Sequence, residues 1–434
     1  MPLNANHFDT ILVGGGLQSG LIAMALRHAD PNHSILLIER DSTIGGNHTW
    51  SFHLSDVEEH FLAAIDSLIE TTWNQYSVRV GRTRRTLRLP YASISSTHFA
   101  TVIAGILDTT SQSKLLTGCV ARDVDGSSVQ LEDGRTFTAD LVIDSRGPGA
   151  QRVDAKANQD SQNFYQGGYQ KFWGFEFELN SDWPDMNPII MDDRTGQEDG
   201  FRFFYVLPFD RRRVMIEDTR FSNTTELNRD ECLGRVEAYL ETRGIAAGRI
   251  IREEHGVLPM PIDHQHRPSV NPNPSRPILG GYAGGWFHAA TGYSFPLAAA
   301  VAMTIAETST SSNRRLATGQ SLEKLAEDYS FQATFGRFLN RLMFELVRPE
   351  SRYQIFQRFY RVLGEQQISR FYSHRFRRSD AARIVIGMPP TGLRPIRFAR
   401  SFRSGGSTKV HQTVGGQSTT GSGNSKGHFR KASA

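Results

Sequence analysis

The chain has 434 residues, of which 38% are hydrophobic; it is too long for one simple core, so we expect two or three domains. No run approaches the about 20 apolar residues of a membrane span, and residues 1–7 do not resemble a signal peptide, so a cytoplasmic or membrane-surface protein is expected. The formal charge of +4 includes residues 391–434, which carry eight Lys and Arg and no acid, leaving 41 basic against 45 acidic residues elsewhere. The balance gives no support for nucleic acid as a partner.

The two cysteines, Cys119 and Cys232, stand in unrelated contexts. Neither has the spacing of a metal ligand or a redox pair, and we predict no metal site. Both are expected to be reduced and structural.

Residues 8–46 have the order of strand, glycine-rich turn, helix, strand and acid that holds the ADP half of a dinucleotide. The β-rich run 9–13 stops at Gly14, which lets the chain turn tightly, and Gly16 lets the backbone approach a pyrophosphate. The helix predicted at 17–27 offers its unpaired N–H groups to that anion. The buried strand 34–38 ends at Glu39, 23 residues after Gly16 and near the spacing of about 20 expected for the carboxylate that binds the ribose.

Two details refine this prediction. The third glycine of the fingerprint is missing: Ser19 stands in its place and Gly20 follows, so helix and strand must pack around a hydroxyl. After Glu39, a short spacer leads to a pair of glycines, a pattern that resembles two-domain FAD enzymes more than nicotinamide dehydrogenases. The candidate cofactor-binding residues here are Gly14, Gly16, Ser19, Glu39, Gly45 and Gly46.

The rest of residues 1–165 is predicted to complete the first part of the nucleotide-binding domain. Residues 79–91 are strand-like, 96–107 helical, and 129–137 form a hairpin. The buried strand 139–144 leads to Gly147. In FAD proteins of this layout the glycine after such a strand passes close to the cofactor; a surface turn is the alternative.

Residues 166–272 differ in residue pattern from the segments before them and are predicted to form the substrate domain. The runs 201–207 and 213–219 indicate a hairpin whose first strand has aromatic residues on both faces. Aromatic walls beside a flavin domain indicate a long apolar cavity. The alternative is a sheet covered by helices on one face and by the flavin domain on the other, which explains the position of any single Phe equally well.

The chain is expected to return to the nucleotide-binding domain over residues 273–310. Residues 276–284 read as its last strand, with Gly280 near the end, and a glycine-rich loop at 286–296 precedes a small-residue helix at 297–306. A helix N-terminus directed at a flavin ring can stabilise charge on that ring. Gly280, Thr291 and Gly292 are therefore candidate cofactor contacts.

Residues 311–390 are predicted to form a helical region, and a membrane-facing surface is one interpretation of it. Apolar residues recur at helical spacing, namely Phe331, Phe335, Phe338, Leu339, Leu342, Met343 and Leu346. Such a stripe is usually core, and seating on a membrane surface is the alternative. Residues 391–434 lack periodicity, and we expect a disordered basic tail.

Four motifs together resemble those of bacterial lycopene β-cyclases. They are residues 14–23, 45–53, 216–219 (Ile-Glu-Asp-Thr) and 287–294, and the likeness runs from about residue 8 to residue 390. The resemblance implies an α/β fold: a Rossmann-like FAD-binding domain of the GDI/hydroxylase-like two-domain flavoproteins, an antiparallel-sheet substrate domain and a C-terminal helical region.

The resemblance also implies a reaction. The family converts the acyclic ends of lycopene, through γ-carotene, to the β-ionone rings of β-carotene without net redox change, with reduced FAD and with NAD(P)H as reductant. Protonation of the terminal C1=C2 bond gives a tertiary cation, the neighbouring double bond closes the ring, and C6 loses a proton. The expected partners are lycopene, γ-carotene and a membrane surface, with the protein peripherally associated with the inner membrane.

Glu217 is the first choice for the essential carboxylate, because it matches the first acid of the family's motif at the end of the aromatic hairpin. The alternative is an ion pair with Arg202 or another arginine of the hairpin. Asp218 alternates to the opposite face of the strand and is expected to be structural. Whether Glu217 or the reduced flavin donates the proton stays open. His288 is the second candidate catalytic residue, with a role as backbone anchor as its alternative.

Two other functions share parts of the pattern. A flavin monooxygenase or desaturase acting on a lipid would have the same FAD motifs, but would consume oxygen or oxidise its substrate. A prenyl-binding escort protein of the related fold needs no flavin, and the intact glycine and Glu39 motifs argue against it.

Overall fold

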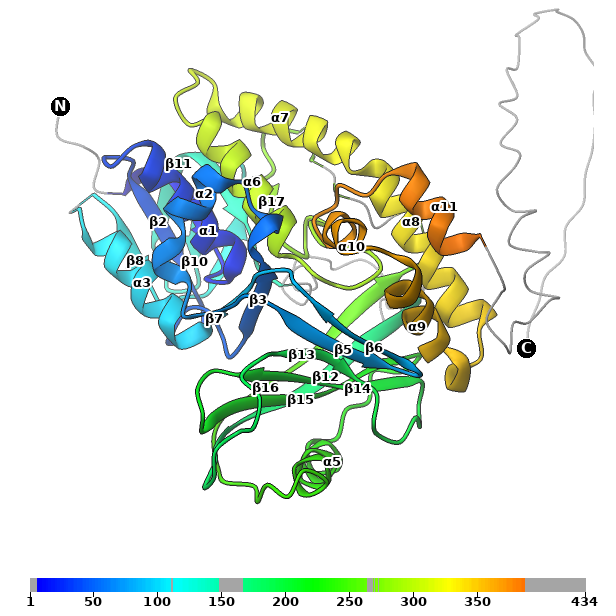
Figure 1. Cartoon of the computed structure of the whole chain (residues 1–434). Coiled ribbons are helices and arrows are strands. Elements are labelled where there is room, and N and C mark those ends of the chain that lie inside the picture. Colours follow the sequence, from blue (N-terminus) through cyan, green and yellow to red (C-terminus); the bar gives the residue numbers. More distant parts are fainter. Residues whose placement is uncertain are drawn as a thin grey trace, which may run out of the picture. The chain divides into compact units, whose positions relative to one another are not determined.

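The computed structural model describes residues 6–110, 112–147, 167–263, 268, 270–271 and 273–386 (Figure 1). The tail that the sequence predicts at residues 391–434 lies outside these ranges. Within them, no helix is both long enough and apolar enough to cross a membrane.

The first sheet is the nucleotide-binding sheet, with strand order β8-β2-β1-β11-β10-β9 and β17 paired with β11. Its central strands and β17 run parallel, while β9, β10 and β11 pair antiparallel. Its strands are β1 (His7–Val13), β2 (Ile35–Ile38), β8 (Lys114–Leu116), β9 (Ala121–Val124), β10 (Ser128–Leu131), β11 (Thr136–Asp144) and β17 (Ile278–Leu279). The predicted strand at 139–144, the hairpin at 129–137 and the late return of the chain to this sheet are confirmed.

Three helices pack on this sheet around a common core: α1 (Leu17–Ala29), α3 (Ser96–Asp108) and α6 (Phe295–Glu307). All four residues of β2 are buried, because a parallel strand is covered on both faces. The alternate side chains of β1 and β11 form a separate cluster with β9 and β10 on the other face. The predicted Rossmann-like α/β class is thus confirmed.

A small antiparallel sheet follows the second glycine pair, in the order β3-β7-β4. It consists of β3 (Thr49–His53), β4 (Thr71–Trp73) and β7 (Tyr91–Ser95). Short helices lie between its strands, namely η1 (Leu54–Asp56), α2 (Glu59–Ala64) and η2 (Asp66–Leu68). All of β7 is buried, so this sheet lies inside the molecule.

The second large sheet has the order β16-β12-β15-β14-β13-β5-β6, and only its β13–β5 pair is parallel. Its strands are β5 (Tyr76–Val80), β6 (Thr83–Leu87), β12 (Gly167–Glu178), β13 (Ile189–Asp192), β14 (Phe201–Pro208), β15 (Arg213–Ser222) and β16 (Arg249–Pro261). Helix α5 (Arg229–Glu241) covers one face, and the C-terminal helices lie over the other (Figure 1).

One prediction needs correction. Residues 79–91 were expected to be one strand-like element of the nucleotide-binding domain. The chain instead turns at Gly81, whose φ is +56°, and makes the β5–β6 hairpin at the edge of the second sheet. The pairing of β5 with β13, more than 100 residues later, causes the difference, because no local pattern shows it.

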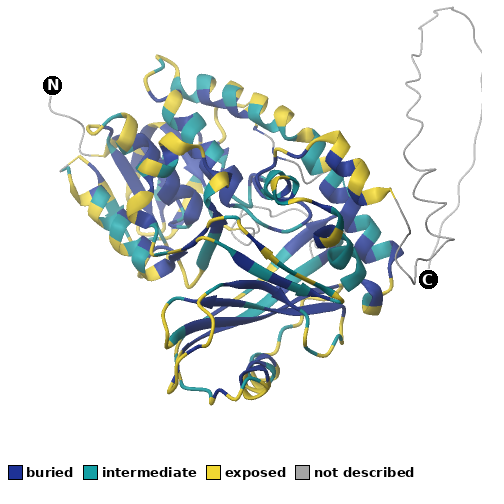
Figure 2. Ribbon diagram, in the orientation of Figure 1, coloured by how far each residue is buried: buried dark blue, intermediate teal, exposed yellow. Residues whose placement is uncertain are grey.

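The C-terminal region is helical, as predicted. It contains α7 (Arg314–Asp328), α8 (Ser330–Arg341), the π-helical turn η3 (Leu342–Leu346), η4 (Pro349–Ser351), α9 (Tyr353–Val362), α10 (Glu365–Tyr372) and α11 (Arg378–Val385). The apolar stripe of α8 and η3 packs inward on the second sheet: Leu339, Met343 and Leu346 are buried and the phenylalanines are half-buried (Figure 2). The core interpretation of this stripe therefore fits the structure, and the stripe offers little surface to a membrane.

Candidate active site

The glycine turn after β1 has the geometry that a dinucleotide site requires. Gly14 has φ of +94°, and a Cβ there would lie 3.0 Å from backbone atoms of Ser145 and Arg146. Among the described residues, no atom lies within 4 Å of the position of a Cβ on Gly16, and no side chain caps the N-terminus of α1 that follows. Open space and free N–H groups at a helix start suit a pyrophosphate.

Glu39 lies at the carboxyl end of β2, beside this turn. Its carboxylate accepts hydrogen bonds from the backbone N–H groups of Gly15 (2.6 Å) and Asp41 (2.9 Å). Gly45 donates its N–H to the Gly15 carbonyl (2.9 Å), and both Gly45 and Gly46 have positive φ. The acid and the two glycine segments that the sequence singled out therefore lie together at one edge of the sheet.

The third glycine of the fingerprint is missing, and Gly20, one residue after Ser19, takes its role in helix packing. A Cβ on Gly20 would lie 2.2 Å from the ring of Phe99 on α3, so Gly20 makes the close helix packing. Ser19 is fully buried, and its hydroxyl has no hydrogen-bond partner among the described residues. The helix packing therefore accommodates the hydroxyl of Ser19, as the sequence requires.

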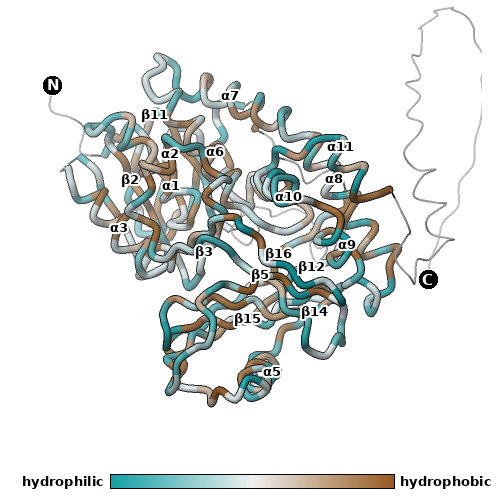
Figure 3. Tube along the Cα trace, viewed as in Figure 1, coloured by the Kyte–Doolittle hydropathy of each residue, from teal (hydrophilic) through white to brown (hydrophobic). Residues whose placement is uncertain are grey.

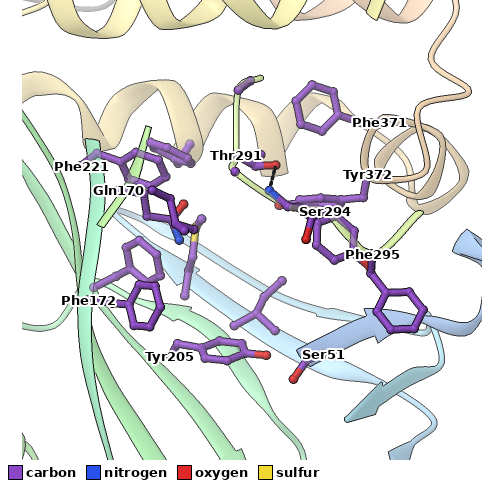
Figure 4. A pocket seen from close by; sticks show the side chains of 18 of the residues that line it. Ser51, Gln170, Phe172, Tyr205, Phe221, Thr291, Ser294, Phe295, Phe371 and Tyr372 are labelled. Atoms are coloured by element: carbon purple, nitrogen blue, oxygen red, sulfur yellow. Dashed lines mark hydrogen bonds between the residues drawn. The ribbon is translucent and has the colours of Figure 1, made fainter. Parts of the chain in front are cut away.

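The returning segments complete this edge. Gly280 donates its N–H to the Asp144 carbonyl (2.8 Å), and a Cβ on it would clash with Ser145, whose own hydroxyl is buried without a partner among the described residues. Gly147 has open space around its Cα. Thr291 and Gly292 lie in the loop before α6, and Thr291 Oγ1 accepts a hydrogen bond from the N–H of Tyr293 (3.3 Å; Figure 4).

A cavity of about 360 Å³ lies between this loop and the second sheet. Phe172, Tyr205 and Phe221 project into it from the sheet, and Thr291, Ser294 and Tyr372 face them from the opposite side (Figure 4). Residues of α8, η3, α9 and α11 close its far end, namely Leu339, Met343, Ile355, Phe356, Phe359 and Ile384. The predicted apolar, aromatic cavity is thus present, and it extends from the loop before α6 to the C-terminal helices.

Glu217 is the carboxylate that lines this cavity. It lies on β15 with 8% of its surface exposed, and Thr219 donates a hydrogen bond to its Oε1. Burial, with a smaller contribution from the charge of Glu254, raises the pKa of Glu217 to about 8. A carboxyl group in this place is protonated at neutral pH and is able to donate a proton.

Asp218 points to the other face of β15, toward α5. Arg202 Nε lies 3.3 Å from Asp218 Oδ1, and Arg220 Nη2 lies 3.9 Å from Oδ2, all of them buried. Arg202 therefore pairs with Asp218 and with Glu231 (3.0 Å) rather than with Glu217. The alternative interpretation from the sequence, an ion pair between Glu217 and Arg202, is therefore wrong.

His288 does not line the cavity. Its Nδ1 accepts a hydrogen bond from the N–H of Ala290 (3.3 Å), and its ring packs against Phe371 and His374. Burial lowers the pKa of His288 to about 4, so it is neutral at physiological pH. The geometry fits the alternative of a backbone anchor, and the catalytic assignment needs this correction.

Sequence reasoning missed two polar sets that border the cavity. Tyr205 and Tyr91 share a hydrogen bond between their hydroxyls (2.9 Å). Tyr293 donates to Asp56 Oδ2 (2.6 Å), which also lies 3.3 Å from His53 Nδ1 and so ties the loop before α6 to β3. The bonds between Tyr91 and Tyr205 and between Asp56 and Tyr293 have no local signal, because each joins residues at least 114 positions apart.

The model of lycopene cyclase proteins matches residues 9–397 of the chain. The chain belongs to the lycopene cyclase family. This family membership is the one that the sequence motifs indicated. The lycopene β-cyclase of Pseudescherichia vulneris is 36% identical over 385 residues, which cover 89% of this chain and 95% of the relative. That of Pantoea ananas is 34% identical over 390 residues, covering 88% and 95%.

Two solved structures with a fold similar to that of this lycopene cyclase family member are a monooxygenase and a reductase-like protein. PqsL of Pseudomonas aeruginosa, a probable FAD-dependent monooxygenase, aligns with a TM-score of 0.56 at 13% identity over 80% of this chain and 99% of that chain. A geranylgeranyl bacteriochlorophyll reductase-like protein of Thermoplasma acidophilum aligns with a TM-score of 0.53 at 13% identity, covering 88% and 96%. These likenesses show that the chain shares its overall fold with these two proteins.

Proposed function

We propose that the chain is a lycopene β-cyclase that closes the acyclic ends of lycopene into β-ionone rings, through γ-carotene to β-carotene. The observation that carries this proposal is a buried, protonated carboxyl group, Glu217, on the wall of an otherwise apolar and aromatic cavity. Protonating an alkene requires an acid held close to it, and the resulting cation survives only where water is excluded.

FAD is the proposed cofactor, and the residues present fit it. The open side of Gly16 and the uncapped start of α1 would receive the pyrophosphate, and Glu39 the ribose. The bound FAD would be lined by Ser19, Gly45, Gly46, Gly147 and Gly280. Its flavin ring would face Thr291 and Gly292. When bound and reduced, with NAD(P)H as the reductant, FAD supplies negative charge beside the substrate.

Glu217 is proposed to give its proton to the terminal C1=C2 bond of the substrate. A pKa of about 8 keeps the proton on Glu217 at neutral pH until the alkene accepts it. The next double bond then attacks the tertiary cation, and the ring is completed when C6 returns a proton to the protein. Acid and base are thereby regenerated without net redox change.

The aromatic walls are proposed to stabilise the cation. Phe172, Tyr205 and Phe221 present rings to the cavity beside Glu217 (Figure 4). Each ring face attracts a cation by about 0.5 to 2 kcal/mol. The same apolar surface keeps out the water that would quench the cation.

Peripheral contact with the inner membrane is proposed for substrate delivery. Residues 330–386 contain eleven arginines, no lysine and four acidic residues, an excess of positive charge that anionic lipids attract. Val385 and Ile386 at the end of α11 are 48% and 73% exposed, and this stretch is hydrophobic in Figure 3. Ile384, next to them, lines the cavity, so a hydrocarbon could pass from the bilayer along α11.

The test is anaerobic incubation of the protein with lycopene, FAD and NADPH, followed by chromatography of the carotenoids. We expect γ-carotene to appear first and β-carotene later, with no oxygen requirement. Oxidised or hydroxylated products that appear only with oxygen would instead support the flavin monooxygenase or desaturase.

Gly16→Val tests the cofactor site separately. The added side chain fills the open space beside α1, so bound flavin absorbance and cyclisation should both be lost. Gly105→Val, where a Cβ likewise meets no described atom within 4 Å, is the matched control and should bind flavin normally. Normal flavin content in Gly16→Val would show that the site is placed wrongly.

A further inference from the structure

Glu217 stands in a row of four residues that face the same side of the second sheet. Strand register aligns Glu254 of β16 with Gly174 of β12, Gly174 with Glu217 of β15, and Glu217 with Tyr205 of β14. Side chains in one such row point the same way. The two glutamates are thus separated only by a residue without a side chain.

Gly174 provides the space in which the two acids approach each other. A Cβ built on Gly174 would lie 3.1 Å from Cγ of Glu254 and 3.5 Å from Cβ of Glu217, so both side chains lean over it. Glycine in the interior of a strand weakens the sheet and often marks a place of close approach. Any larger residue here would fill the gap between the carboxyl groups.

The row is also a border between apolar and polar surface. On one side of it lies the aromatic cavity, which Glu217 lines and Glu254 does not. On the other side, Arg252 donates to Glu254 Oε2 (3.0 Å) and to Glu176 Oε2 (2.8 Å). Glu254 is 3% exposed, and burial raises its pKa, while the charge of Arg252 opposes this rise and favours the carboxylate.

The polar side of the border reaches the loop that follows the second glycine pair. Arg252 donates to the Asn47 carbonyl (3.1 Å) and also to Thr49 Oγ1. Asn47 Nδ2 in turn donates to the Glu253 carbonyl (3.4 Å). Glu254 is therefore anchored between the substrate sheet and the nucleotide-binding side of the protein.

We propose that Glu254 is a positioning residue for the cyclisation: it faces Glu217 across Gly174, and the two carboxyl groups hold one proton between them. The charge of Glu254 keeps that proton on Glu217, which touches the cavity. When the proton moves to the alkene, the π electrons form the new C–H bond and the pair changes from one negative charge to two, beside the new cation. The proton released from C6 then returns to the pair.

Other charged and titratable groups near Glu217 do not provide such a partner. Tyr205 and Tyr91 are neutral, since burial raises the pKa of both. Asp218, Arg202 and Arg220 lie on the opposite face, behind the sheet. The other titratable groups that line the cavity are His48, His53, Tyr282, Tyr293 and Tyr372, and the charged groups that continue the polar side of this face are Arg213, Arg252 and Glu176.

The proposal rests on the proposed function for its role in catalysis, but the shared proton is measurable without turnover. Infrared difference spectra recorded across a pH titration report the C=O band of a protonated glutamic acid, assigned to Glu217 by its loss in Glu217→Gln. In Glu254→Gln, the midpoint of this band should fall by about 1 pH unit or more, because the neighbouring charge is gone. The alkaline limb of the cyclisation profile should move by the same amount.

Glu253→Gln is the matched control, because Glu253 is the next residue of β16, points to the other face and pairs with Arg229. It should leave the midpoint unchanged. Should Glu254→Gln fail to fold, Glu254→Asp decides, since the shorter side chain draws the charge away and the midpoint should fall by a smaller amount. An unchanged midpoint in a folded Glu254 variant overturns the proposal. If the midpoint shifts as expected but the wild-type protein cyclises no lycopene, the proposed function fails and the shared proton stands.

Discussion

The two faces of the second sheet both bury carboxylates, and they do so in opposite ways. On the cavity face, Glu217 has no cation within salt-bridge distance among the described residues, and burial favours its neutral form. On the α5 face, burial also raises the pKa of the adjacent Asp218, but the charges of Arg202 and Arg220 beside it oppose this rise and favour the carboxylate. One residue of offset along a strand therefore separates a proton donor from a structural ion network.

The largest effect that would sharpen this comparison is expected from Glu217→Gln. Glutamine keeps the size and the hydrogen bond from Thr219 but removes the ionisable proton, so cyclisation should fall by about 10² or more while flavin binding survives. The measurement is β-carotene formation per bound flavin under anaerobic conditions. Near-normal turnover would leave the reduced flavin as the leading proton donor.

Asp218→Asn should affect stability more than chemistry. It removes the fully buried anion that Arg202 and Arg220 share and leaves them the more exposed Glu231 and Asp199, at a cost on the order of 1 to 3 kcal/mol in the free energy of unfolding. Urea unfolding measures this cost, and turnover per folded molecule should fall less than in Glu217→Gln. A stable but inactive Asp218→Asn, beside an active Glu217→Gln, would reverse the assignment of the two faces.

The sequence predicted the faces of β15 correctly because alternation along a strand is a local property. It did not reveal Glu254, since the run Arg252 to Glu254 reads as surface charge until pairing with β12 turns alternate residues inward. The same limit explains the wrong assignment of residues 79–91, whose strand pairs with β13 from far along the chain. The N-terminal glycine turn was more predictable, because strand, turn, helix and acid all lie within 39 residues.

The pH dependence of stability distinguishes the two faces in a second way. The pKa of Glu217 is about 8 in the folded protein and near 4.5 when unfolded, so the folded state holds a proton that the unfolded state releases. The stability that Glu217 contributes is complete below pH 4.5 and is lost as the pH rises toward 8.

The Glu217→Gln variant does not lose stability in this way as the pH rises, because glutamine does not ionise. The variant's free energy of unfolding should therefore rise relative to wild type between pH 5 and pH 8, by on the order of 3 to 4 kcal/mol, and the difference should then level off. Urea titrations at several pH values measure it. Asp218→Asn should show a smaller gain, because Arg202 and Arg220 oppose the rise that burial causes in the pKa of Asp218. A flat difference for Glu217→Gln would mean that Glu217 is already ionised at neutral pH.

The smallest effects on cyclisation are expected from changes to the aromatic side chains. Two variants of Tyr205 distinguish the contribution of its ring from that of its hydroxyl. Tyr205 shares the row of Glu217, and its hydroxyl bonds to Tyr91 (2.9 Å), so Tyr205→Phe removes one neutral hydrogen bond and should slow cyclisation by at most about tenfold. Tyr205→Leu also removes the ring face, which attracts a cation by up to about 2 kcal/mol, and should slow cyclisation further.

Phe204→Leu is the matched control. Phe204 is the neighbouring residue of β14 and packs against Tyr239 on the α5 face, so its substitution should leave turnover unchanged. Equal losses in Tyr205→Leu and Phe204→Leu would mean that the rings act only through packing, and the difference between the two faces would then rest on the carboxylates alone.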